Sequence, residues 1–291
     1  MNILITGGAG FIGSHIADTL IKEHKVCIVD NFSSGKKENL NAKIKCYNID
    51  INDELLDDVF KIEKPEIVIH LAASISVTLS QLNPQKDAIV NIMGSLNTIS
   101  KAKKYSVKTF IAASSAAIYG NLQSPISEDS FLTPLSNYGI SKLAMEYYIK
   151  NSGLNYLILR FSNVFGERQN VNGETGVITI FNDKMQAGNP VYIHGDGEQI
   201  RDFIYVKDLA LIIGKLIEQN IHNDIINVST GKGLSINKLF SIMKYKNNYK
   251  NAPIYDDARE GDIKISILDN RKLLQYLPSF KFTNIEDAFN L

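Results

Sequence analysis

The sequence predicts an α/β fold, a doubly wound parallel sheet with a smaller C-terminal lobe. Two observations predict it. Up to Arg160, short runs rich in β-branched residues alternate with longer segments of helical period, which is typical of parallel strands joined by right-handed helical crossovers. Runs such as Ile67-Val68-Ile69 are apolar throughout, as expected for strands whose sheet is covered on both faces.

The expected elements follow one another regularly in the first part of the chain. Strands are expected at residues 2–6, 25–29, 43–47, 66–70, 107–112 and 154–159. Helices are expected at residues 11–23, 53–62, 85–104 and 137–151. Because strand and helix alternate, successive strands should lie parallel and share one sheet.

The alternation breaks after Arg160. A loop rich in Gly and Asn is expected at residues 166–176, a helix at 177–187 and a turn at Gly195-Asp196-Gly197. Further on, the expected elements are strands at 203–206 and 225–228, a helix at 207–219 and a solvated loop at 244–251. We therefore expect one domain over residues 1–163 together with 202–230, and a smaller lobe over residues 164–201 and 231–291.

Composition excludes several classes of partner. The 291 residues carry 31 basic and 31 acidic side chains, a formal net charge of +0, which gives no electrostatic reason to expect nucleic acid or an acidic membrane. No signal peptide or transmembrane helix is expected. Five scattered histidines predict no metal site. Two cysteines, Cys27 and Cys46, fit a reducing setting and predict a cytoplasmic location.

A glycine-rich segment joins the first expected strand to the first expected helix, Thr6-Gly7-Gly8-Ala9-Gly10-Phe11-Ile12-Gly13. Two registers fit it, Gly7-x-x-Gly10-x-x-Gly13 and Gly8-x-Gly10-x-x-Gly13. Either lets the backbone turn tightly and approach a pyrophosphate, while the helix N-terminus offers free N–H groups. An ordinary glycine-rich turn is the alternative. The strand–turn–helix context favours a Rossmann-like dinucleotide-binding domain.

Acidic residues at the ends of the next strands indicate which dinucleotide. Asp30 ends the second strand, where a carboxylate accepts hydrogen bonds from the adenosine ribose and repels a 2′-phosphate. NAD is therefore favoured over NADP, although Lys36 and Lys37 nearby weaken this inference. Asp50 ends the third strand, where contact with adenine and simple helix capping are both open.

Tyr138 and Lys142 are four residues apart, so both side chains lie on one face of a helix. A nearby ammonium favours the phenolate and lowers the pKa of a tyrosine from its usual value near ~10. The pair is then a candidate general base for a sugar or alcohol hydroxyl. This spacing also arises by chance in many helices, so its weight comes from the glycine segment and from Ser115, one segment upstream.

The chain resembles the extended short-chain dehydrogenases/reductases, and within them the nucleotide-sugar epimerases of the UDP-glucose 4-epimerase type. The resemblance runs nearly from end to end. It is carried by residues 7–13, Asp30-Asn31-Phe32-Ser33-Ser34-Gly35, His70-Leu71-Ala72-Ala73, Ser114-Ser115-Ala116-Ala117-Ile118-Tyr119-Gly120, residues 138–142, Arg160-Phe161-Ser162-Asn163-Val164-Phe165-Gly166, Gly195-Asp196-Gly197-Glu198-Gln199-Ile200-Arg201-Asp202-Phe203 and Arg259-Glu260-Gly261-Asp262.

The resemblance implies NAD as a retained cofactor and a hydride removed from C4 of the sugar and then returned. Tyr138 would take the proton of the 4-hydroxyl, Lys142 would bind the nicotinamide ribose, and Ser115 would hydrogen-bond the 4-oxygen. It also implies a set of cofactor-binding residues. These are Gly7, Gly10, Phe11, Ile12, Gly13, Asp30, Asn31, Ser33, Gly35, Asp50, Ile51, Leu71, Ala72, Ala73, Tyr138 and Lys142.

For the substrate, the resemblance implies a UDP-hexose. Arg201 and Arg259 would bind the diphosphate, since guanidinium groups match phosphate oxygens; a surface salt bridge is the alternative for each. Ser266 would lie beside the sugar 2-substituent, where its small size admits an N-acetyl group, unless it lies outside the pocket. The implied substrate-binding residues are Ser115, Tyr138, Asn163, Val191, Tyr192, His194, Arg201, Arg259, Asp262 and Ser266.

Departures from neighbouring enzymes narrow the reaction. Related dehydratases carry an Asp-Glu pair after the active-site hydroxyl residue and decarboxylases carry a Glu, whereas Ala116 and Ala117 follow Ser115 here. The competing hypotheses are a net 4-keto-sugar reductase using exchangeable NAD(P)H and a catalytically dead NAD-binding regulatory protein. Relatives pair the helices corresponding to residues 85–104 and 137–151 with their symmetry mates, so a homodimer is expected.

Overall fold

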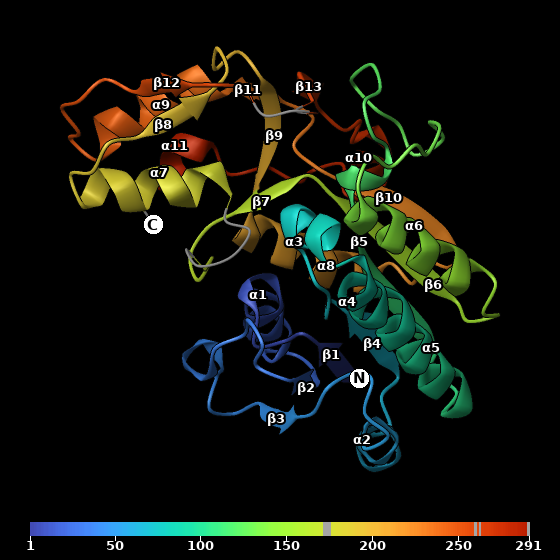
Figure 1. Cartoon of the computed structure of the whole chain (residues 1–291). Helices are drawn as coiled ribbons and strands as arrows, with labels where there is room; N and C mark the ends of the chain where they lie inside the picture. The colour runs from blue at the N-terminus through green and yellow to red at the C-terminus, as the bar shows by residue number, and fades with distance from the viewer. Residues whose placement is uncertain (171–175, 259–260, 262, 290–291) are drawn as a thin grey trace.

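The computed structural model describes residues 1–170, 176–258, 261 and 263–289, arranged in a larger and a smaller lobe (Figure 1). A seven-stranded sheet forms the larger lobe, in the order β10-β6-β5-β4-β1-β2-β3, with every pair of neighbours parallel. Its strands are β1 (Asn2–Thr6), β2 (Lys25–Asp30), β3 (Lys45–Asn48), β4 (Ile67–His70), β5 (Thr109–Ser115), β6 (Tyr156–Phe161) and β10 (Asp224–Val228). The predicted doubly wound parallel sheet is confirmed.

The strand order reverses next to β1, because the chain first adds β2 and β3 on one side and then β4 on the other. Such a reversal leaves a crevice outside the carboxyl ends of the strands, where ligands bind in open α/β sheets. The glycine segment follows β1 at this edge, and His70 is the last residue of β4. The fold itself therefore brings the residues of several distant motifs together.

Helices cover both faces of the large sheet, which explains its apolar strands. On one face lie α1 (Phe11–Leu20) and α8 (Val206–Glu218), which pack on each other. Buried residues of α1 and α8, such as Ile16 and Ile213, join Ile5 of β1 in one hydrophobic core. The other face carries α2 (Leu56–Glu63), α5 (Gly94–Lys104) and α6 (Asn137–Lys150), which contribute to a second core.

The smaller lobe is built mainly from the later part of the chain (Figure 1). In a four-stranded sheet, β9 (Ile200–Tyr205) pairs with β7 (Asn163–Phe165), β11 (Gly233–Ser235) and β13 (Ile265–Ser266), while β8 (Tyr192–His194) pairs with β12 (Ile254–Asp256). Helices α7 (Val177–Gln186) and α9 (Ile236–Lys246) pack together around Phe181 and Phe240. The shorter helices are α10 (Arg271–Tyr276) and α11 (Ile285–Ala288). The domain boundaries given above stay a prediction.

Two expectations differ from the structure. The helix expected at residues 85–104 is divided into α4 (Pro84–Ala88), a π-helical turn η2 (Ile89–Met93) and α5, and it is preceded by α3 (Val77–Leu82). Ser76 and Asn83 cap α3 and α4, accepting hydrogen bonds from the backbone of Leu79 and Lys86. The loop expected at 244–251 instead begins inside α9. Short 3₁₀ turns lie at η1 (Lys37–Asn39) and η3 (Ala116–Ile118).

No helix among the described residues is long and apolar enough to cross a membrane. The same part of the chain holds no group of three or more His, Cys, Asp or Glu side chains that could bind a metal ion.

Candidate active site

The turn between β1 and α1 needs glycine because other backbone passes very close to it. Gly7 has a φ of +70°, and a Cβ there would lie 2.7 Å from the backbone nitrogen of Ala72. A Cβ on Gly13 would lie 2.3 Å from the carbonyl oxygen of Gly7. These approaches fold the turn over the start of α1, whose first N–H groups have no partner within the helix and are suited to a phosphate.

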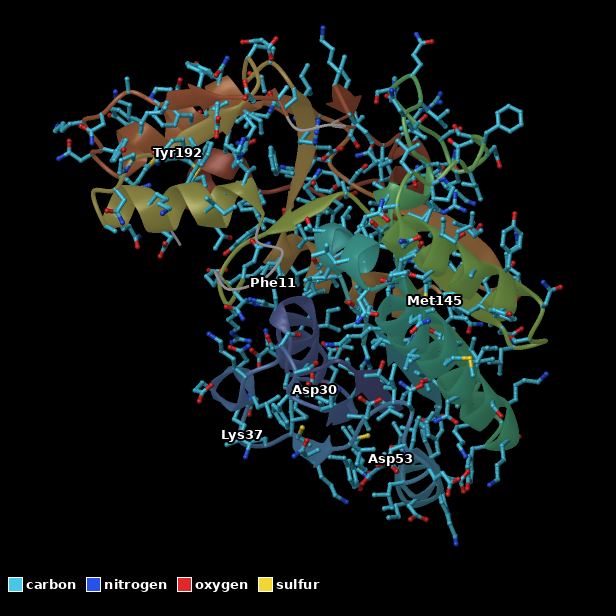
Figure 2. The ribbon with its side chains drawn as sticks, in the orientation of Figure 1. Phe11, Asp30, Lys37, Asp53, Met145 and Tyr192 are labelled. Carbon is cyan, nitrogen blue, oxygen red and sulfur yellow. The ribbon has the colours of Figure 1, made fainter. Side chains whose placement is uncertain are left out.

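A cavity of about 190 Å³ opens at the carboxyl edge of the large sheet. It brings together most of the predicted cofactor residues, from the glycine turn, the ends of β2 and β4, and helix α6. Figure 2 labels Phe11 at the start of α1 and Asp30 at the end of β2. The predicted residues that line it are Gly7, Gly10, Phe11, Ile12, Gly13, Asp30, Asn31, Ser33, Asp50, Ile51, Leu71, Ala72, Ala73, Tyr138 and Lys142. Gly35 lies just behind the lining, where a Cβ would meet Asp30 Oδ1 at 2.9 Å.

Asp30 is fixed by backbone hydrogen bonds that leave each oxygen free to accept more. Its Oδ2 accepts from the N–H of Ala9 at 2.9 Å and its Oδ1 from the N–H of Phe32 at 2.8 Å. A carboxylate oxygen has about two acceptor positions, so ribose hydroxyl groups can still bind. Asp30 therefore ties the glycine turn to β2 while presenting an acceptor to a ligand in the cavity.

Asp50 caps a turn and not a helix, since α2 begins at Leu56. Its Oδ1 accepts from the backbone N–H of Asn52 at 2.8 Å, and its Oδ2 accepts from the amide of Asn31 at 2.6 Å. Burial opposes ionisation of Asp50, but these hydrogen bonds hold the pKa of its carboxyl below the usual value. Of the two roles that the sequence left open for Asp50, adenine contact and helix capping, the structure excludes helix capping. Both Asp50 and Asn31 line the cavity.

The cavity fits a dinucleotide. Ser114 also lines it, with a side chain 3% exposed whose hydroxyl has no hydrogen-bond partner among the described residues. A buried hydroxyl without a partner is costly unless a ligand or water supplies one. Together with the crowded glycine turn, this polar atom matches a bound NAD. Sequence reasoning did not select Ser114 for this role.

Helix α6 carries Tyr138 and Lys142 on its cavity side. The helix starts at a Ser136 cap, whose hydroxyl accepts from the N–H of Gly139 at 3.1 Å. Gly139 lets α6 approach the turn after Ser115, because a Cβ there would lie 2.7 Å from the carbonyl oxygen of Ala117. Ser115 ends β5 and caps η3 through a hydrogen bond from Ala117 N–H. The predicted catalytic residues thus come from two elements in close approach.

Lys142 is 3% exposed, an unusual degree of burial for a lysine. Burial lowers the pKa of Lys142 to about 8, against the opposite effect of the Glu146 and Asp87 carboxylates. The ammonium form therefore still predominates at pH 7. Its field is available to stabilise a phenolate on the same helix face.

His70 lies inside the large lobe, where burial and then the Lys142 charge lower its pKa to about 3. Its Nε2 lies 2.9 Å from Ser95 Oγ, which donates its proton to the carbonyl of Asn91. Ser95 must therefore accept from Nε2–H, so Nδ1 accepts from the Thr6 hydroxyl at 2.8 Å. This neutral histidine connects β1 to Ser95 of α5, and Ser95 in turn hydrogen-bonds η2.

A second cavity, of about 320 Å³, lies in the smaller lobe. Four of the predicted substrate-binding residues line it, namely Asn163, Tyr192, His194 and Arg201. Figure 2 labels Tyr192 in this lobe. Val191 does not line the cavity: it precedes β8 and is 1% exposed in the hydrophobic core of the smaller lobe. The sequence analysis missed Lys184, Gln199 and Phe203, which also line the cavity.

The predicted substrate residues that follow Arg201 in the chain lie either outside the two cavities or outside the described residues. Asn163 uses its amide to donate to the carbonyl of Asp202 at 3.0 Å. Ser266 lies opposite Arg201 in the pairing of β13 with β9 and lines neither cavity. Arg259 and Asp262 lie outside the described residues. Asn91 accepts a hydrogen bond from the backbone N–H of Ser74 at 2.8 Å and donates one to the carbonyl of Ser74 at 2.9 Å.

The sheet, the glycine turn and the Tyr138–Lys142 helix define an extended short-chain dehydrogenase/reductase. The chain belongs to the NAD dependent epimerase/dehydratase family, whose profile matches residues 3–229. It is an NAD-dependent epimerase, and NAD is its cofactor.

Three similar proteins support this assignment. A protein of Methanocaldococcus jannaschii named "Putative UDP-glucose 4-epimerase" is 45% identical over 277 residues, covering 93% of this chain and 90% of the relative. The UDP-glucose 4-epimerase of Thermotoga maritima, solved with UDP-glucose, matches with a TM-score of 0.95 at 42% identity, covering 100% and 97% of the two chains. The UDP-N-acetylglucosamine 4-epimerase of Methanobrevibacter ruminantium M1, in complex with UDP-N-acetylmuramic acid, matches with a TM-score of 0.93 at 40% identity, covering 99% and 95%.

Proposed function

We propose that this protein interconverts UDP-glucose and UDP-galactose by transient oxidation at C4 of the hexose. The observation that carries the proposal is the buried Lys142 beside Tyr138 on α6, facing the cofactor cavity at the end of β5. Two similar proteins that bear the name UDP-glucose 4-epimerase support the substrate. The second cavity, in the smaller lobe, would take the nucleotide.

NAD, when bound, would accept the hydride from C4 and return it. The chain's own residues would handle the proton and the position of the sugar. Tyr138 as phenolate would accept the proton of the 4-hydroxyl, and Ser115 would hydrogen-bond the same oxygen. Lowering a tyrosine pKa by three units takes ~4 kcal/mol of differential stabilisation, which the ammonium of the buried Lys142 can supply in good part.

The surroundings of Ser115 favour epimerisation over elimination. Ala116 and Ala117 form the turn η3 that follows Ser115, and neither offers a carboxylate. Loss of water from C5 and C6 or of carbon dioxide would need a further acid or base at this place. A reaction that only removes and returns hydrogen at C4 needs none.

We also propose that UDP-N-acetylglucosamine and UDP-N-acetylgalactosamine are substrates. The family resemblance places the small Ser266 beside the sugar 2-substituent, and its cross-strand neighbour Arg201 lines the second cavity, although Ser266 itself lines neither cavity. The name of the Methanobrevibacter protein supports this. We also propose that the enzyme works in the cytoplasm, since neither Cys27 nor Cys46 forms a disulfide.

The test is to incubate the purified protein with a panel of UDP-hexoses, UDP-N-acetylhexosamines and UDP-uronic acids without added cofactor, and to separate the products by chromatography. We expect NAD to copurify and both UDP-hexoses to reach the same equilibrium mixture. Accumulation of NADH in proportion to product would instead identify a net oxidoreductase. Conversion of the uronic acids alone would overturn the proposed substrate.

A further inference from the structure

A cluster of buried polar side chains lies against α6, the helix that carries Tyr138 and Lys142. Asp87 of α4 is 2% exposed, Asn91 of η2 is 1% exposed and Ser141 of α6 is 2% exposed. Asn91 Nδ2 donates to Asp87 Oδ1 at 3.0 Å and lies 3.1 Å from Ser141 Oγ. Both α4 and η2 pack on α6. The cluster therefore connects the Asp87 carboxylate, through Asn91, to Ser141, the residue that precedes Lys142.

Lys142 has two carboxylates acting on it, and they differ in their other partners. Glu146 is engaged by the buried guanidinium of Arg160, through Nε at 3.0 Å and Nη2 at 2.7 Å. Asp87 accepts hydrogen bonds from neutral groups, and the ion pairs among the described residues do not include it. Burial raises the pKa of the Asp87 carboxyl, whereas hydrogen bonds from Ser141 and Asn91 and the positive charge of Lys142 act in the opposite direction. A buried charge of this kind needs a compensating charge.

We propose that Asp87 is a positioning residue of the epimerisation site, whose buried carboxylate is the counter-charge that keeps Lys142 charged and in place. The proposal rests on the proposed function, since it gives Asp87 its role through Lys142. Asn91 and Ser141 connect Asp87 to α6, so the same contacts that bring the charge close also hold the catalytic helix against η2.

Other titratable groups near Lys142 do not replace Asp87. His70 of β4 is neutral, because burial and then the Lys142 charge lower its pKa to about 3. Arg160 of β6 is paired with Glu146, as above. Tyr138, on the same helix face, is the group that Lys142 is proposed to assist. Removing the negative charge of Asp87 lowers the pKa of both Lys142 and Tyr138, since a nearby anion raises both.

The first experiment measures kcat against pH for the holoenzyme with UDP-glucose. The profile should be a bell whose acid side reports ionisation of Tyr138 and whose basic side reports loss of the Lys142 proton. In Asp87→Asn both sides should move to lower pH by roughly 0.5–1 unit, with KM unchanged. Asp208→Asn is the matched control, because Asp208 is also a buried carboxylate, on α8, and is hydrogen-bonded by Thr283. It should not move the profile.

The second experiment observes Lys142 directly and needs no turnover. Lysine labelled with ¹³C at Cε is titrated by NMR in the NAD-bound protein, and the Lys142 signal is assigned by its loss in Lys142→Met. We expect the Lys142 midpoint to fall in Asp87→Asn and in Asp87→Ser, and to return toward wild type in Asp87→Glu. The second charge-free variant serves if the first fails to fold.

The two experiments separate the two proposals. An unchanged Lys142 midpoint in folded Asp87→Asn and Asp87→Ser would overturn the role of Asp87. Absence of epimerase activity in the wild type would overturn the proposed function, while the NMR titration would still decide whether Asp87 keeps Lys142 charged.

Discussion

At the scale of single residues, burial has opposite consequences for a lysine and a thiol. Removing a side chain from water disfavours its charged form. Burial therefore lowers the pKa of Lys142 to about 8 and raises the pKa of Cys27 to about 12. Lys142 remains mostly charged at pH 7 and is close to Tyr138, whereas Cys27 stays a neutral thiol in the hydrophobic core. The same physical effect leaves Lys142 able to change its charge near neutral pH and keeps Cys27 as an unreactive thiol.

Tyr138→Phe should lower kcat by about 10²- to 10⁴-fold, the range typical of a lost proton-transfer group. NAD retention and UDP affinity should stay close to wild type, because the ring and the helix are kept. Lys142→Ala should reduce both kcat and NAD retention. Steady-state kinetics and calorimetric titration with UDP measure these effects. Near-normal turnover of Tyr138→Phe would show that another group takes the proton.

Ser266→Tyr tests the proposed substrate range. A tyrosine beside Arg201 should leave room for a hydroxyl at the sugar 2-position but not for an N-acetyl group. Activity on UDP-N-acetylglucosamine should then fall at least about tenfold more than activity on UDP-glucose, since a steric clash penalises one substrate only. The comparison is made as kcat/KM for the two substrates in one preparation. Equal loss on both, or no loss, would place the selecting residue elsewhere.

At the scale of elements, strands with a recognisable local sequence pattern could be predicted, whereas very short strands could not. The strands of the large sheet are apolar runs flanked by turns, and the predicted positions agree with β1 to β6 within a few residues. The strands β7, β8, β11, β12 and β13 have two or three residues each. They exist because partners distant in the chain pair with them, and local sequence carries little of that information.

The residues of the candidate site also fall into two groups: those recognisable within one segment of the sequence, and those whose role depends on the fold. The glycine turn and the Tyr138–Lys142 spacing lie within single segments, so the sequence could predict them. Lys184 and Asp87 have no local pattern that distinguishes them from ordinary helix residues. Their importance depends on which cavity or neighbour the fold brings to them. Val191, which precedes β8, is buried in the hydrophobic core and does not line the cavity, and this burial also depends on the fold.

Gly13→Ala tests the packing of α1 against the turn before it. The new Cβ would lie 2.3 Å from Gly7 O and 2.7 Å from Gly8 Cα, so the turn must shift. Overpacking of this kind costs about 1–3 kcal/mol in the free energy of unfolding, and the protein should also purify with less NAD. Denaturant unfolding and the bound-NAD content at purification measure these two effects.

Gly214→Ala is the control for that change. A Cβ at Gly214, inside α8, would meet its nearest neighbours at 3.7 and 3.8 Å, which is ordinary contact. Since alanine favours helix over glycine by about 1 kcal/mol, this variant should be as stable as wild type or more stable, with full NAD. Similar losses in both variants would show that the close approach around Gly13 is not the cause.

At the scale of the whole molecule, one surface exposes more apolar side chains than a monomer needs. The large hydrophobic side chains that are exposed on α3, α4–η2 and α6 are Val77, Leu79, Leu82, Ile89, Met93, Ile140, Tyr147 and Tyr148. These helices lie side by side on the large lobe (Figure 1). A concentration of exposed apolar side chains on neighbouring helices is typical of an interaction site. The homodimer expected from the sequence involved residues 85–104 and 137–151, which include most of α4, η2 and α6 but not α3.

We therefore predict a homodimer with a two-fold axis, in which this helical surface meets its own copy. Light scattering coupled to size exclusion should give twice the mass of 32.4 kDa at micromolar concentration. The double variant Ile89→Glu with Met93→Glu should be monomeric, because it places like charges opposite each other and buries them in the contact. Tyr245→Glu is the control, since Tyr245 is also highly exposed but lies on α9 in the smaller lobe. It should remain dimeric. A wild-type protein with the mass of one chain would contradict the prediction, and dissociation of the Tyr245 variant would place the contact on the smaller lobe.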